Sequence, residues 1–230
     1  MDFVDAHVHL GYSIPTDDVI KQMSECNVKK IVIFALPAEI DEGLDMNYYI
    51  LKKAEKFNEF IPFYYVTGDL KIPDEIDLFR GLKWHWVRGL THIRSNLNLF
   101  EDKSFLAFLR ELNELKLPIV IEEDFEFTKE FVNIMDNSVI IIPHLGTISG
   151  NPNDFLKEFA EYDNVYFDTA LASESLINKF YNELGADKLI FGSDIPFGTM
   201  KNELNKILKM EIPKSDIRRI TKENILKILK

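Results

Sequence analysis

The chain is poor in cysteine, and Cys26 is the single cysteine among its 230 residues. An intrachain disulfide is therefore excluded. Long apolar runs are also missing: no stretch of about 18 apolar residues occurs, so we expect no transmembrane helix. The N-terminal segment MDFVDAHVHL has neither the basic region nor the small-residue cleavage site of a signal peptide. We therefore expect a cytoplasmic protein that does not associate with a membrane.

Positive charge is scarce, because 27 Lys and Arg stand against 38 Asp and Glu, for a formal net charge of −11. Nucleic-acid binding requires a basic surface, so we expect no nucleic-acid partner. The expected partner is a small-molecule substrate, and the sequence is compatible with a homo-oligomer. No Pro/Gly/Ser linker, charge block or low-complexity tract interrupts the chain. Residues 1–230 are accordingly expected to form one domain.

Short apolar or β-branched runs recur along the chain and predict eight strands. They lie at 3–10, 30–36, 61–67, 86–93, 118–123, 139–146, 165–170 and 188–194. Between them, apolar residues at helical spacing predict helices over 17–27, 47–60, 102–116, 128–137, 152–163, 173–185, 201–210 and 214–230. This alternation is typical of parallel βαβ units.

Eight such units form either a closed barrel or a long doubly wound sheet. A dinucleotide-binding sheet would carry G-x-G-x-x-G after its first strand, and the segment HLGYSIP that follows the first run lacks it. We therefore predict an α/β protein with a (β/α)8 TIM-type barrel, in which functional groups gather at the carboxyl ends of the strands.

Polar side chains stand at the end of most predicted strands. These strand-end residues are His7, His9, His92, Arg94, Glu122, Glu123, Asp124, His144, Asp168, Thr169, Ser193 and Asp194. Residues two apart on a strand share one face, so His7 and His9 should point the same way, together with Asp5. Closure of a barrel would bring the last strand, and Asp194 with it, beside the first.

Two imidazoles and carboxylates form a suitable ligand set for a divalent transition metal, most simply zinc. Each residue also has a simpler interpretation. Asp194 could cap the helix that follows it, and His144 could serve only to form a turn. Arg88 and Arg94 could form structural ion pairs, and His85 precedes its predicted strand and is expected to have no function. The metal hypothesis rests on the joint placement of these residues at strand ends.

Six motifs, spread from the first predicted strand to the last helix, resemble the amidohydrolase superfamily. They are DAHVHLG, LPIVIEE, IIIPHLG, NVYFDTA, DKLIFGSDIPFG and ITKENILKIL. The closest group is amidohydrolase-2, which includes metal-dependent hydrolases, decarboxylases and lactonases. The resemblance implies a distorted (β/α)8 barrel. It also implies that RGLTHI corresponds to an RGIRH stretch in the lactonases, with Thr91 in place of the usual arginine.

The resemblance implies roles for single residues. His7 and His9 would be metal ligands, and Asp194 would be the general base and also a ligand. His144 would polarise the substrate carbonyl or orient the attacking water. The sequence departs from the pattern at Glu122, which stands where the family usually has a histidine, so we expect Glu122 to complete the metal site.

The sequence thus predicts a metal-dependent hydrolase in which water attacks the carbonyl of an amide, ester or lactone. Asp194 would take the proton and His144 would stabilise the oxyanion. Candidate substrate contacts are Arg88, His92, Arg94 and Tyr12. Two alternatives stay open: a decarboxylase or metal-free lactonase on the same barrel, and a barrel without catalysis that serves binding or assembly.

Overall fold

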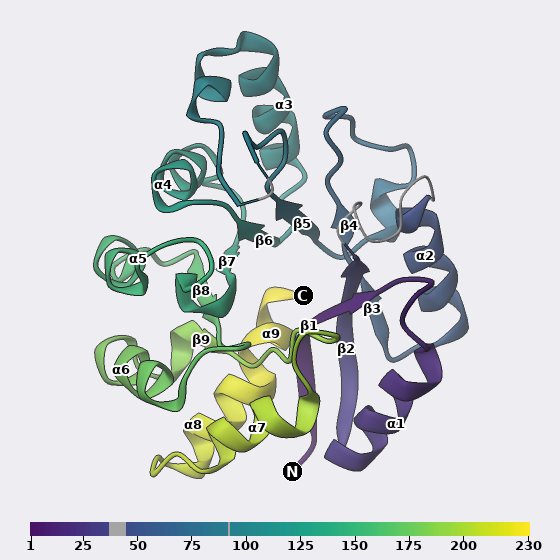
Figure 1. The fold of residues 1–230 in the computed structure, drawn as a ribbon, viewed down its shortest axis with the longest axis vertical. Helices are drawn as coiled ribbons and strands as arrows, with labels where there is room; N and C mark the ends of the chain where they lie inside the picture. Colours follow the sequence, from purple (N-terminus) through teal and green to yellow (C-terminus); the bar gives the residue numbers. More distant parts are fainter. Residues whose placement is uncertain (37–44, 92) are drawn as a thin grey trace.

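The structure is a computed structural model that describes residues 1–36, 45–91 and 93–230. Its strands surround a common centre, and its helices, except the one at the C-terminus, lie outside them (Figure 1). The strands are β1 (Phe3–Leu10), β2 (Val28–Ala35), β3 (Phe60–Pro62), β4 (Tyr64–Tyr65), β5 (Leu82–His85), β6 (Ile119–Glu122), β7 (Ile140–Ile142), β8 (Val165–Asp168) and β9 (Leu189–Ile190). The prediction of an α/β barrel is confirmed.

All neighbouring strands pair in parallel and in sequence order, β1 to β3 in one sheet and β4 to β9 in the other. One residue, Phe63, separates β3 from β4, and its N–H still donates to the carbonyl of Ile33 at 2.8 Å. The two short strands are therefore halves of one barrel strand. They correspond to the run at 61–67, so the barrel has the eight strand positions that the sequence predicts.

The barrel closes between β1 and the segment that follows β9. The N–H of Ala6 donates to the carbonyl of Phe191 at 3.0 Å, and the N–H of His9 donates to that of Ile195 at 2.9 Å. Val8 and Ile195 form a parallel bridge. The first and last strands are thus neighbours, as the barrel prediction requires.

Helices alternate with most of the strands, but only the 3-10 turn Ile76–Leu78 stands between β4 and β5, and three α-helices follow β9. The α-helices are α1 (Thr16–Cys26), α2 (Met46–Lys56), α3 (Lys103–Glu114), α4 (Phe125–Ile134), α5 (Pro152–Phe159), α6 (Glu174–Leu184), α7 (Met200–Leu208), α8 (Lys214–Arg218) and α9 (Asn224–Ile228). Several begin at a side-chain cap, and Asp124 accepts from the N–H of Phe127 at the start of α4. In the described part of the chain, no helix is long and apolar enough to cross a membrane.

Two apolar layers hold the barrel together. The larger one lies between strands and helices, and the smaller one fills the barrel interior with side chains such as Val4, Val32, Phe34 and Val120. Ile225 of α9 belongs to the interior layer, and α9 lies close to the centre of the ring (Figure 1). The apolar filling supports the strand ends where the polar groups stand.

The prediction of a strand at 86–93 is wrong. The fourth barrel strand is β5, Leu82–His85, which pairs with β6 through Leu82 and Ile119 at its start. Trp86 and Arg88 have φ of 45° and 55°, a left-handed conformation that ends a strand. The described residues of this apolar run, 86–91 and 93, therefore belong to the loop after β5. The apolar composition of the run is typical of a strand, but the left-handed conformation of Trp86 and Arg88 is not.

Candidate metal centre

The register of β1 decides which of its polar side chains enter the barrel. Val4 and Ala6 belong to the interior layer, whereas Val8 and Leu10 face the helices. The alternation changes between them because the pairing with β2 shifts register between Asp5 and Val8. After this irregularity, the odd-numbered positions point inward.

His7 and His9 consequently share the inner face, as expected, but Asp5 does not lie on it with them. The carboxylate of Asp5 accepts from the N–H of His7 at 3.1 Å and from the N–H of Ser193 at 2.9 Å. Asp5 thus links β1 to the segment after β9. Burial raises its pKa to about 7, against the opposing effect of these hydrogen bonds.

Asp194 and His144 enter the site from tight turns after β9 and β7. Their φ values are 54° and 57°, a conformation that costs energy for a non-glycine residue. The Asp194 N–H donates to the carbonyl of His7 at 2.8 Å, and its own carbonyl accepts from Phe197 at 2.7 Å. The turn is therefore fixed by backbone contacts to β1, and the side chain is aimed at the two histidines.

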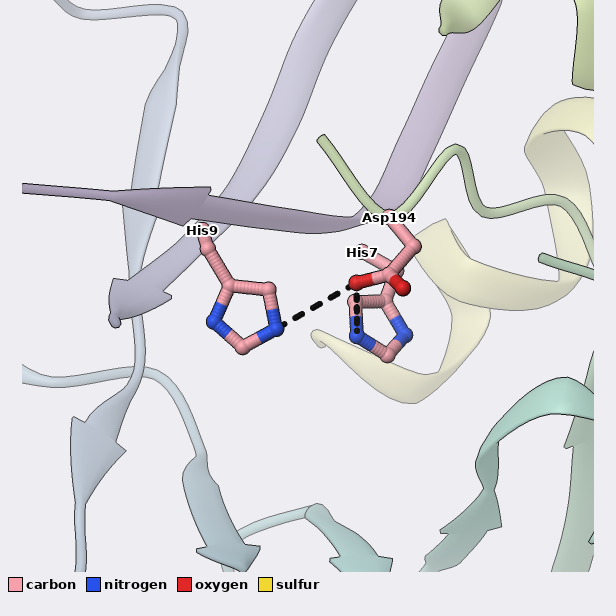
Figure 2. A group of neighbouring side chains, drawn as sticks. All are labelled: His7, His9 and Asp194. Atoms are coloured by element: carbon pink, nitrogen blue, oxygen red, sulfur yellow. Dashed lines mark ion pairs between the residues drawn. The ribbon is translucent and has the colours of Figure 1, made fainter. Parts of the chain in front are cut away.

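His7, His9 and Asp194 form a compact buried group that could hold a metal ion, with one ligand atom from each within 4.8 Å of the others. The carboxylate of Asp194 lies between the two rings (Figure 2). Its Oδ1 is 3.2 Å from Nε2 of His7 and 3.3 Å from Nε2 of His9.

The other ring nitrogen of each histidine is already engaged. Nδ1 of His9 donates to the carbonyl of Ala35 at 2.9 Å, because a carbonyl can only accept. Nδ1 of His7 contacts Oδ2 of Asp168, and Oδ1 of Asp168 accepts from the N–H of Ala170 at 2.6 Å. Such partners fix the ring so that Nε2 presents its lone pair to the site, as metal-binding histidines require.

When both rings are neutral, as metal binding requires, acceptor atoms are therefore crowded together without a donor. Nε2 of His7 and Oδ1 of Asp194 are buried and have no hydrogen-bond partner among the described residues. Buried polar atoms without a partner are rare and costly, and a cation between them removes the conflict. Two imidazoles and one carboxylate form a ligand set that fits a divalent transition metal.

The electrostatics agree with a site made for a cation. Burial lowers the pKa of His7, but the carboxylates of Asp168 and Asp194 outweigh it and raise that pKa to about 9. Burial lowers the pKa of His9, which therefore stays neutral. Burial also raises the pKa of Asp194, yet the adjacent imidazoles outweigh it and hold that pKa well below its usual range. Asp194 is ionised in this surrounding.

His144 and Glu122 stand beside this group. Nε2 of His144 is 3.9 Å from both Oδ2 of Asp194 and Oε2 of Glu122, and its Nδ1 donates to the carbonyl of Ala170 at 3.0 Å. Glu122 itself accepts from Nζ of Lys83 at 2.9 Å. The structure thus brings together all the predicted metal and catalytic residues, but Glu122 is paired with a lysine and is not a member of the three-residue group.

The amidohydrolase family model, Amidohydro_2, matches residues 78–230, two thirds of the chain. The chain belongs to the amidohydrolase family. The match includes Glu122, His144 and Asp194, while the two histidines of β1 precede it. No protein of curated function matches this amidohydrolase.

Solved structures show the same fold at low sequence identity. An uncharacterised TIM-barrel protein from Bordetella bronchiseptica superposes with a TM-score of 0.76 at 12% identity, over 100% of this chain and 98% of that one. A putative 2-pyrone-4,6-dicarboxylic acid hydrolase from Pseudomonas putida gives 0.74 at 13%, over 99% and 97%. A dihydroxybenzoic acid decarboxylase from Polaromonas sp., with bound manganese and an inhibitor, gives 0.74 at 12%, over 99% and 96%.

Three of the predicted substrate contacts, Tyr12, Arg88 and Arg94, are exposed on loops that follow β1 and β5. Tyr12 is exposed and packs against Tyr49, with ring centroids 4.4 Å apart. Arg88 donates to the carbonyl of Gly68 at 2.6 Å, and Arg94 is exposed on the loop that follows β5. His92 lies outside the described residues. The roles of these four residues as substrate contacts stay predictions.

Sequence reasoning missed three residues that touch or border the site. Lys83 and His85 lie on β5, and the expectation that His85 has no function came from placing the strand too late. The pattern Lys-x-His at 83–85 carries the same two-residue spacing as the histidines of β1 and could have revealed them. Phe197 is 57% exposed, and its ring lies 5.9 Å from that of His9. It is the aromatic residue of the FGSDIPFG motif that borders the metal group.

Proposed function

We propose that this amidohydrolase is a metal-dependent hydrolase that acts on the carbonyl group of a small-molecule amide, ester or lactone. The observation that carries the proposal is the cluster of unpartnered acceptors, Nε2 of His7 and Oδ1 of Asp194, beside Nε2 of His9. A divalent ion, zinc in the simplest case, supplies there the polarisation of a carbonyl and the acidification of a water molecule.

The chain's own residues provide the proton transfers. Asp194 is ionised, and its Oδ2 faces His144, so this oxygen is placed to take a proton from a water molecule that enters the site. His144 donates its Nδ1 proton to the carbonyl of Ala170. It can therefore stabilise an oxyanion only when Nε2 is also protonated, and in its neutral form it accepts a hydrogen bond from the water instead.

A decarboxylase is the second candidate, because the manganese-containing decarboxylase of Polaromonas shares this fold over nearly its whole length. Decarboxylation protonates a carbon atom and needs no attacking water. The ionised Asp194 beside the unpartnered acceptors favours the hydrolase, since an ionised carboxylate is a base and cannot deliver a proton.

Metal analysis and product analysis test the proposal together. We expect about one divalent ion per chain in protein purified without chelator, and zinc-dependent turnover of esters, lactones or amides without release of carbon dioxide. Asp194→Asn should lose metal and activity, and Asp187→Asn, at an exposed pair with Arg219, should lose neither. Carbon dioxide from a carboxylated substrate would support the decarboxylase. Activity that survives complete metal removal would contradict both and favour a metal-free lactonase.

A further inference from the structure

His85 is the last residue of β5 and pairs in register with Glu122 at the end of β6. Its side chain is 18% exposed, so part of the ring is accessible, and its Nε2 lies 3.6 Å from Oε1 of Glu122. Burial lowers the pKa of His85 to about 3. The ring is therefore neutral and carries a single N–H, on either Nδ1 or Nε2.

The neighbours of the ring decide which nitrogen carries the proton. Nδ1 lies 3.0 Å from the hydroxyl oxygen of Tyr65, and a hydroxyl can donate or accept. Burial raises the pKa of Glu122, yet the ammonium of Lys83 holds that pKa well below its usual range, so the carboxylate is ionised and can only accept. A proton on Nδ1 would leave the lone pair of Nε2 facing this anion. The proton therefore belongs on Nε2, and Nδ1 accepts from Tyr65.

Tyr65 is well placed to fix this arrangement, because its own backbone is bound on both sides. The N–H of Tyr65 donates to Oδ1 of Asn47 at 2.8 Å, and Nδ2 of Asn47 donates to the carbonyl of Tyr65 at 2.9 Å. Asn47 belongs to α2, so a helix outside the barrel secures the strand that carries the tyrosine. A fixed hydrogen-bond partner on one ring nitrogen determines what the other nitrogen offers.

The N–H on Nε2 of His85 can still serve a further partner. Its distance of 3.6 Å from Oε1 of Glu122 is too long for a hydrogen bond. The second oxygen of Glu122, Oε2, accepts from Nζ of Lys83 at 2.9 Å, so Oε1 is the oxygen that stands beside the donor of His85.

A donor and an ionised acceptor side by side select the group that binds between them. A hydroxyl fits, because it accepts from Nε2 of His85 and donates to Oε1 of Glu122 at the same time. A carbonyl or ether oxygen has no proton for Glu122. A carboxylate would place a second anion beside Glu122, which costs energy in a buried site.

This pair of groups borders the metal group. Oε2 of Glu122 is 3.9 Å from Nε2 of His144, and the same nitrogen is 3.9 Å from Oδ2 of Asp194. Contacts shorter than 4 Å thus lead from His85 to Asp194. A small molecule whose carbonyl lies beside Asp194 can therefore extend its hydroxyl to His85.

We propose that His85 is a substrate-binding residue, which donates from Nε2 to a hydroxyl group of the substrate while this hydroxyl donates to Oε1 of Glu122. Tyr65 is the positioning residue that keeps the proton of His85 on Nε2. The inference rests on the proposed function and narrows its substrate class to hydroxyl-bearing esters, lactones or amides. The hydroxyl belongs to an alcohol or a phenol.

Probe binding to the protein as purified tests the role of the hydroxyl. His85 is followed by long-range ¹H–¹⁵N NMR of histidine side chains, which distinguishes a protonated from an unprotonated ring nitrogen, and Nε2 should be the protonated one. Phenol or cyclohexanol should shift the His85 resonances and bind at least about fivefold more tightly than its counterpart without a hydroxyl, fluorobenzene or fluorocyclohexane. The tighter of the two hydroxyl probes identifies a phenol or an alcohol as the source.

Variants separate the two roles. His85→Leu should abolish the preference for the hydroxyl probe, and His85→Gln should restore it, because the amide nitrogen of glutamine also donates. Tyr65→Phe should weaken binding of the hydroxyl probe about threefold and spread the proton of His85 over both ring nitrogens, which a merely structural role would not do. Tyr181→Phe is the matched control. It removes a hydroxyl that donates to Asp216 from α6, and it should change neither measurement.

Two results would overturn the inference: a proton on Nδ1 of His85 in the parent, or equal binding of the probes with and without a hydroxyl. If His85→Leu does not fold, the probe comparison in the parent and in His85→Gln still decides. The outcome is also separate from that of the proposed function. Hydroxyl binding at His85 in a protein that holds no divalent ion would contradict the hydrolase alone. Zinc-dependent hydrolysis by a protein whose His85 responds to neither hydroxyl probe would contradict this inference alone.

Discussion

Asp168 at the end of β8 contacts Nδ1 of His7 through its Oδ2, while its Oδ1 accepts from the N–H of Ala170. The carboxylate is itself fixed, and it fixes in turn the imidazole that faces the metal position. Two strands far apart in the sequence thus determine the direction of one nitrogen lone pair. Nothing in the spacing of the histidines reveals this dependence.

Asp168→Asn should weaken metal binding about 10- to 100-fold, the usual effect of losing the partner of a metal-binding histidine. The fold should persist, because the amide oxygen can still accept from Ala170. Zinc affinity and circular dichroism measure the two effects. Asp163→Asn, in the loop that precedes β8, serves as the control. A parent-like zinc affinity in Asp168→Asn would show that the orientation of His7 does not depend on the carboxylate.

Gly192 permits the close approach of these two side chains. A Cβ at this position would lie 2.7 Å from Cβ of His7 and 2.8 Å from Oδ1 of Asp168, closer than real contacts allow. Gly192→Ala should therefore displace the pair, with an overpacking cost of about 1–3 kcal/mol and a clear loss of zinc affinity. Thermal unfolding and zinc titration are the measurements. The control is the exposed substitution Ser175→Ala. Gly185→Ala is unsuitable, because alanine at the positive φ of Gly185 would itself strain the backbone. Full zinc affinity in Gly192→Ala would mean that β1 and β8 can shift without cost.

His144→Asn should retain the bound metal and the fold, but turnover should fall roughly 10²-fold or more, the scale for losing a positioned proton donor or acceptor. Asparagine suits the position because it tolerates the left-handed backbone that His144 adopts, with φ of 57°. Metal content and steady-state rates are measured together. If metal is lost in step with activity, His144 is a primary ligand and the proposed role is wrong.

The sequence predicted the barrel and the approximate position of seven of its eight strands, because apolar periodicity and parallel alternation are local signals. The fourth strand could not be placed in the same way. The segment 86–93 is as apolar as a strand, and among its described residues only the left-handed Trp86 and Arg88 reveal a loop. Backbone conformation of that kind depends on the surrounding structure.

The part of the candidate site that stands at strand ends could be predicted from the sequence. His7, His9, His144 and Asp194 met as expected because barrel closure is a property of the fold. The partner of Glu122 was not predictable, since Lys83 is 39 residues earlier and its strand was misplaced. The prediction that Asp5 shares a face with the two histidines was wrong, because a register shift in β1 changes which side chains face inward.

The last prediction concerns the residue at which this chain departs from the expected pattern. Glu122→His restores the histidine that the resemblance leads us to expect, but it leaves the ammonium of Lys83 buried without its anion. Breaking a buried pair on one side costs about 3–5 kcal/mol, so the melting temperature should fall by roughly 6 °C or more. Adding Lys83→Met to Glu122→His should recover most of that loss, because both charges are then absent. Thermal unfolding of the parent, the two single variants and the double variant gives the coupling free energy between the positions. Additive losses in the double variant would show that Lys83 and Glu122 do not depend on each other, and Glu122 would then be free to serve as the fourth metal ligand.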